Sequence, residues 1–80
     1  KYKRVKIIWQ DIVTDASWFD SLEDVEKLSF QWCEDIGYLF SKDKKTVKIF
    51  TSFNYDGDKL SVGTVTVYPT KIVRKIEVLK

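Results

Sequence analysis

The feature that most constrains this fold is the lack of a covalent or metal crosslink in a chain of 80 residues. Cys33 is the only cysteine and there is no histidine, so an internal disulfide and a structural zinc site are both excluded. A domain of this size buries only about 60% of the surface that its unfolded chain exposes, which leaves a marginal core. Small domains offset this with a crosslink, a metal or a partner subunit. By elimination, we expect one domain, residues 1–80, that associates with copies of itself.

The residue composition also indicates the cellular setting. A lone cysteine is typical of a reducing compartment. No apolar run approaches the roughly 20 residues that a membrane-spanning helix needs. We therefore expect a soluble, cytoplasmic protein that makes no membrane contact.

The first third of the chain predicts one strand and one helix. Apolar residues alternate with basic ones over residues 2–9, which is typical of a half-buried strand. Ser21 stands where the N-cap of a helix of about two turns belongs. A helix this short persists only if its apolar stripe docks on another surface. That stripe consists of Leu22, Val25 and Leu28.

From Phe30 onward, every segment predicts a strand. Gly37 interrupts the second strand, where the missing side chain permits a sharp bend. The pair Asp56-Gly57 predicts a hairpin. Around Gly63-Thr64 the apolar face changes parity, which indicates a β-bulge or a tight bend. The sequence thus predicts a mainly β fold: a small, strongly bent, five-stranded antiparallel barrel with one short helix near the N-terminus.

The tryptophans divide between core and surface. Trp9 and Trp32 lie on apolar strand faces and are expected in the core. Trp18 lies beside Phe19 in an irregular stretch, where it either covers one end of the barrel or contacts another protein. The apolar face expected for the second strand comprises Phe30, Trp32, Ile36, Tyr38 and Phe40.

Charge is distributed in blocks, although the net charge is only +2. Residues 1–10 carry four basic and no acidic side chains. Residues 11–35 carry eight acidic side chains and one lysine, and residues 36–80 carry nine basic and four acidic ones. Such a layout bears on the choice of partner and not on the fold.

The composition argues against an enzyme. Without histidine the usual general base near neutral pH is missing, and Ser-His-Asp and Cys-His arrangements cannot form. The segment Asp56-Gly57-Asp58 lacks the other ligand positions of a calcium loop, and no glycine-rich phosphate loop occurs. We expect no catalytic residue, no metal site and no cofactor.

Two predicted turns carry the candidate binding residues. Lysines gather at the turn after the second strand, where they either attract phosphates or simply keep a hairpin turn soluble. In the turn before the last strand, a tyrosine either stacks on a base or packs in the core. The candidate nucleic-acid-binding residues are Lys42, Lys44, Lys45, Lys48, Tyr68, Thr70 and Lys71.

Gly37, Leu39 and Asp43 have the spacing of a known motif, with a glycine in the second strand, an apolar residue two positions later and an aspartate after the turn. In this respect residues 36–79 resemble the Sm and Sm-like family, in particular the short Sm-like proteins of phages. The resemblance implies a bent five-stranded sheet with one tight helical turn at residues 68–71. It also implies a homo-oligomeric ring, in which the fourth strand of one subunit pairs with the fifth strand of the next.

The chain departs from the family pattern at several positions. Thr46 and Val47 stand where the family has a methionine and an RNA-contacting asparagine, and Tyr68-Pro69 lies nearest to the Arg-Gly pair of the second motif. The helix follows an extra N-terminal strand instead of opening the chain.

The resemblance implies a ring that binds single-stranded RNA or DNA in nucleic-acid processing, within the host cytoplasm if the protein is phage-encoded. An alternative from another class stays open. It is an SH3-like adaptor or phage accessory protein that binds another protein through Trp18, Phe19 and the acidic helix.

Overall fold

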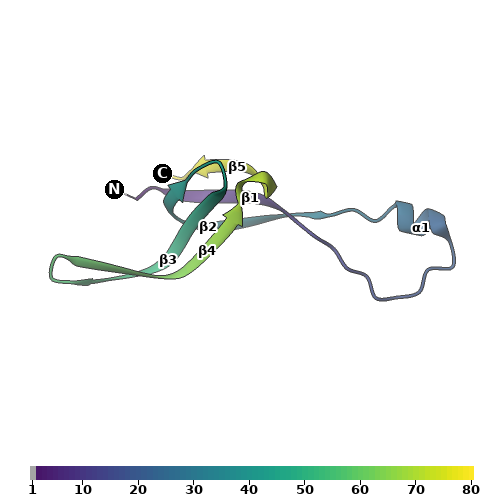
Figure 1. Cartoon of the computed structure of the whole chain (residues 1–80), viewed down its shortest axis with the longest axis horizontal. Coiled ribbons are helices and arrows are strands. Elements are labelled where there is room, and N and C mark those ends of the chain that lie inside the picture. The colour runs from purple at the N-terminus through teal and green to yellow at the C-terminus, as the bar shows by residue number, and fades with distance from the viewer. Residues whose placement is uncertain (1) are drawn as a thin grey trace.

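The computed structural model describes residues 2–80, which form one five-stranded antiparallel sheet and one short helix (Figure 1). The strand order across the sheet is β4-β3-β2-β1-β5. This confirms the predicted mainly β fold and the order of its elements. Their bounds are β1 Arg4–Asp11, α1 Leu22–Glu26, β2 Gln31–Lys42, β3 Thr46–Asp56, β4 Lys59–Pro69, the 3-10 turn η1 Thr70–Ile72, and β5 Val73–Val78.

The core lies on one face of the sheet and is built mainly by β1 and β3. Val5 and Ile7 are fully buried, and they pack with Val47, Ile49 and Tyr68. In each of the two strands the residues of this core are two positions apart, and in β1 this is the alternation predicted from sequence. Four partly buried side chains close its margin: Trp9, Leu39, Val73 and Ile76.

The face of β2 that points to the core is opposite to the one predicted. Gly37 pairs with Val5 and Asp35 pairs with Ile7, so the odd-numbered residues of β2 share the core face of β1. Trp32 is 45% exposed and lies on the opposite face, so its predicted place in the core is wrong. The apolar even-numbered residues misled the prediction because pairing with β1, and not composition, sets which face of β2 is covered.

Positive backbone angles mark a bend in β4 and the β3–β4 turn. Thr64 has φ 52°, yet the pairing of β3 with β4 keeps one register from Thr46↔Pro69 to Asp56↔Lys59. The predicted parity change at this point is therefore a bend and not a bulge. The hairpin predicted at Asp56-Gly57 is confirmed, and Gly57 has φ 64° in its tight turn.

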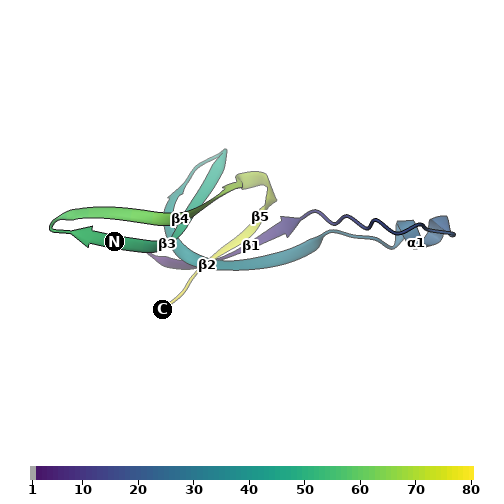
Figure 2. The same ribbon diagram turned by 90° about the horizontal axis from the view of Figure 1, so that it is seen from below.

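Two segments project from opposite ends of the molecule (Figures 1 and 2). One is the β3–β4 hairpin, and the other is residues 12–30, here called the arm, which includes α1. The extents are 61 × 24 × 21 Å and the radius of gyration is 17.2 Å, against about 12 Å for a compact chain of this length. The expected docking of the helix is not observed within residues 2–80, since Leu22 is 80% exposed.

The sheet ends in two open edges. Within residues 2–80, β4 pairs only with β3 and β5 pairs only with β1, so the sheet is not closed into a barrel. Closure therefore stays a prediction. Each edge strand presents unpaired backbone groups that another strand can complete.

We predict that Gly37→Ala destabilises the fold by about 1–3 kcal/mol, because the added Cβ overpacks a filled site. That Cβ would lie 3.0 Å from the Phe50 carbonyl oxygen and 3.0 Å from Ile49 Cδ1. Urea unfolding followed by circular dichroism measures the loss. Gly63→Ala is the control, since its Cβ would meet only Ser52 Cβ at 3.8 Å, and it should cause no loss. Equal effects of the two substitutions would contradict this account of Gly37.

Candidate nucleic-acid interface

The turn between β2 and β3 is organised by the side chain of Asp43. Its carboxylate accepts hydrogen bonds from the backbone N–H groups of Lys45 and Thr46, both at 2.8 Å. The Asp43 N–H donates to the Thr46 carbonyl at 2.9 Å. Aspartate favours such turns because its short side chain reaches amides two or three residues ahead. These amide hydrogen bonds hold the pKa of Asp43 below its usual value of 3.8.

The same turn is joined to η1, which is far away in sequence. The Thr70 hydroxyl donates to the Asp43 carbonyl at 2.8 Å, and the Thr70 N–H donates to the Lys45 carbonyl at 2.9 Å. Pairing of Thr46 with Pro69 places the two segments side by side. The helical turn expected at residues 68–71 is present as η1 but begins two residues later, at Thr70, because Tyr68 and Pro69 still belong to β4. The two turns proposed separately from sequence therefore form one surface.

Six of the seven candidate residues belong to this surface or adjoin it. Lys42 ends β2, Lys44 and Lys45 lie in the turn, Lys48 lies in β3, and Thr70 and Lys71 lie in η1.

Tyr68 lies in the core, where it packs as one of the two alternatives predicts. It is 3% exposed, its ring lies 5.7 Å from that of Trp9, and its hydroxyl donates to the Asp35 carboxylate. Burial, followed by the contact with Asp35, raises the pKa of Tyr68. Its ring is not available for stacking on a base.

A small cleft beside η1 adds two cations that the sequence analysis did not select. The cleft has a volume of about 120 Å³, and its lining includes Lys42, Arg74 and Lys75 above an apolar floor. The guanidinium of Arg74 lies 4.9 Å from the centre of the Trp32 ring, in a cation–π contact. The sequence could have indicated Arg74 and Lys75, because they lie at the start of β5, which begins directly after η1.

Together with the lysines of the two turns, these cations form what we call the basic surface: Lys42, Lys44, Lys45, Lys71, Arg74 and Lys75. Lys48 lies on the other face of the sheet, because Lys42 and not Lys48 pairs with the core residue Val47. Within residues 2–80, Lys75 is its one member in an ion pair, with Glu77 at 3.3 Å. The acidic α1 lies at the far end of the arm, away from the β2–β3 turn in both views (Figures 1 and 2). Its carboxylates do not line the basic surface, so they leave its positive potential in place.

Other kinds of site find no support in this part of the chain. Residues 2–80 contain no group of three or more histidine, cysteine, aspartate or glutamate side chains placed to hold a metal ion. In the same residues, no helix has both the length and the apolar character to cross a membrane. Comparisons of the chain with protein-family models, curated proteins and solved structures gave no match.

We predict that Asp43→Ala loosens the β2–β3 turn, because the backbone amides of Lys45 and Thr46 lose their acceptor. Amide hydrogen exchange should become faster at both residues. Asp43→Asn keeps an oxygen acceptor and should keep most of the protection. Asp58→Ala, in the β3–β4 turn, is the control and should leave both amides unchanged. Unchanged exchange in Asp43→Ala would contradict the role of this carboxylate.

The same contact predicts a pH dependence of the turn. The pKa of Asp43 is lower in the folded chain than the usual 3.8, so its ionised form stabilises the folded turn. This contribution is fully present above pH 3.8 and is lost as the pH falls through the folded-state pKa. Amide chemical shifts of Lys45 and Thr46, followed in an acid titration, should report it. Midpoints at or above 3.8 would contradict the lowered pKa.

Proposed function

We propose that this chain is an Sm-like protein that binds single-stranded RNA or DNA through its basic surface and acts as a homo-oligomeric ring in nucleic-acid processing. The observation that carries the proposal is the contact of Thr70 with Asp43 and Lys45. It brings the β2–β3 turn, with Lys44 and Lys45, against η1, with Lys71. Lysine and arginine side chains bind phosphates by neutralising them and releasing their counterions.

The open edges of the sheet support the oligomeric part of the proposal. β4 and β5 lie at opposite ends of the strand order, and among the described residues 2–80 each pairs on one side only. Pairing β4 of one copy with β5 of the next would continue the sheet and remove both edges. A closed ring would also repeat the basic surface once per subunit, which raises the local concentration of phosphate-binding groups.

The chemistry of the chain supports binding rather than catalysis. Histidine is absent from the sequence, and the one thiol is half-buried. Burial, together with the neighbouring Asp11 and Asp35 carboxylates, raises the pKa of Cys33. A raised pKa disfavours the thiolate, which is the nucleophilic form.

We predict that Lys44→Glu, Lys45→Glu and Lys71→Glu, combined in one variant, weaken binding to a fluorescent single-stranded 15-mer. Fluorescence anisotropy between 25 and 200 mM salt gives the affinity and its salt slope. Three lost phosphate contacts should make the slope of log K against log salt shallower by about 2, since each contact contributes about 0.7 on single strands. Lys27→Glu is the matched control, because Lys27 follows α1 in the arm. If the unmodified protein binds neither RNA nor DNA at 25 mM salt, the proposed function is wrong.

We predict that the native particle has the mass of a small ring, because a subunit with two open edges gains pairing at each of them. Native mass spectrometry and light scattering measure it directly. A stable monomer at tens of micromolar would contradict the ring, and binding could then be tested on the monomer itself.

A second candidate function, from a different class, is supported by the arm. Trp18 is 98% exposed, Ile12 is 85% exposed, and aspartates lie close to both in the sequence. Exposed apolar side chains of this size are typical of protein–protein contact sites. On this reading the chain is an SH3-like adaptor or phage accessory protein that binds a partner protein through Trp18, Phe19 and α1. Binding centred on aromatic side chains should depend only weakly on salt, whereas phosphate contacts depend on it steeply.

A further inference from the structure

The face of the sheet opposite the core carries a group of aromatic side chains that are not part of the basic surface. Phe50 is 2% exposed and forms its centre, with the ring of Tyr38 stacked at 5.6 Å and the ring of Tyr2 edge-on at 5.3 Å. Tyr2 also stacks on Phe40 at 6.0 Å. Phe53 extends the group toward the β3–β4 hairpin, and its ring centre lies 6.2 Å from that of Tyr55.

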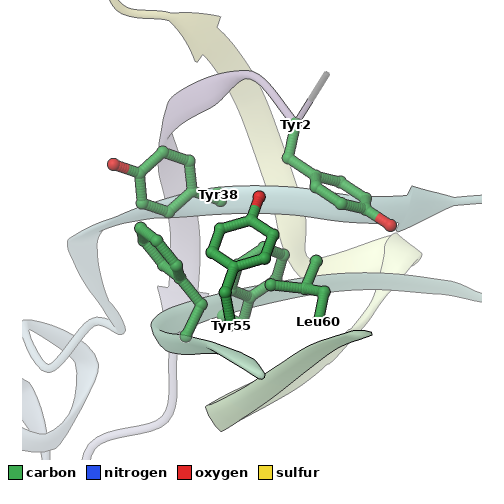
Figure 3. A pocket seen from close by; sticks show the side chains of 6 residues that line it. Tyr2, Tyr38, Tyr55 and Leu60 are labelled. Carbon is green, nitrogen blue, oxygen red and sulfur yellow. The ribbon is translucent and has the colours of Figure 1, made fainter. Parts of the chain in front are cut away.

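These rings enclose an open groove of about 310 Å³ (Figure 3). Tyr2, Tyr38, Tyr55 and Leu60 stand around it, and Phe50 and Phe53 complete the lining. We call this the aromatic groove. Tyr55 is 59% exposed and Phe53 is 51% exposed, so flat ring surface is available to a ligand. Five of the six lining side chains are aromatic and one is aliphatic.

Cations flank the groove on its own face of the sheet. Arg4 pairs with Tyr38 across β1 and β2, so both side chains point the same way. Lys48 precedes Phe50 by two residues in β3 and shares its face. Lys48 lies in β3 between the β2–β3 turn, which carries Lys44 and Lys45, and Phe50, so it stands between that turn and the groove. Asp56, Asp58 and Lys59 occupy the hairpin tip, which leaves the body side of the groove the more positive.

We propose that the aromatic groove is a base-stacking site for single-stranded nucleic acid. This inference rests on the proposed function and names the part of the ligand that the basic surface does not contact. Phosphates lie along Lys48 and the β2–β3 turn, while one or two unpaired bases stack on the rings of Tyr55 and Phe53. Stacking of bases on aromatic side chains favours single strands, because a duplex keeps its bases stacked inside. The acidic arm extends from the other end of the molecule and does not repel the phosphates (Figure 1).

The test compares Tyr55→Leu with Tyr55→Phe, using a single-stranded 12-mer that contains one 2-aminopurine, made both as RNA and as DNA. Tyr55→Leu keeps apolar bulk but removes the ring, whereas Tyr55→Phe keeps the ring. Loss of one stacked base should weaken binding roughly 5- to 150-fold in Tyr55→Leu and leave Tyr55→Phe near the unmodified affinity. Stacking should also quench 2-aminopurine emission, and that quenching should be lost only in Tyr55→Leu. The salt slope should stay unchanged, since no phosphate contact is removed.

Val25→Leu, at an exposed position of α1 in the arm, is the matched control and should bind as the unmodified protein does. Unchanged affinity and quenching in Tyr55→Leu, together with lost binding in the lysine variant, would overturn the stacking site and leave the proposed function standing. No binding by the unmodified protein at low salt would overturn both. A changed native mass in Tyr55→Leu would instead place the groove in a contact between copies of the chain and overturn its role in base binding.

Discussion

The packing of Val5 and Ile7 against Val47 and Ile49 is the constraint on which the other features depend. These four side chains are the largest that are fully buried, and they join the first strand of the chain to the third. Because so few residues form the core, the sheet is covered well only near its centre. Its outlying parts, the arm and the β3–β4 hairpin, extend away from that centre and keep many apolar side chains exposed. A chain that leaves so much apolar surface in water is expected to meet a partner.

Gly37 connects this core to the face that carries the aromatic groove. It is buried opposite Val5, and the absence of a side chain lets β3 approach β2 closely at Phe50. That approach allows Phe50 to be buried beneath the rings of Tyr38 and Tyr2 on the other face. One small residue thus permits tight packing on both sides of the sheet.

Acidic and basic side chains are concentrated in different parts of the molecule. The acidic arm and the basic surface are separated in space, so the chain presents two electrostatic faces despite a net charge of only +2. The open edges of β4 and β5 expose backbone groups whose pairing with another strand requires no particular side chains.

By itself, the sequence determined the order of the elements, the core face of β1, the hairpin at Asp56-Gly57 and the N-cap of Ser21, whose hydroxyl accepts from the Glu23 N–H. Each of these depends on residues close together in the chain. Only the tertiary structure decided that Trp32 lies outside, that Tyr68 lies inside and that Arg74 joins the basic surface. The inward face of β2 is set by its register with β1, and the basic surface by hydrogen bonds between segments about 27 residues apart. Local patterns cannot encode such long-range pairings, because the same alternation fits either face of a strand.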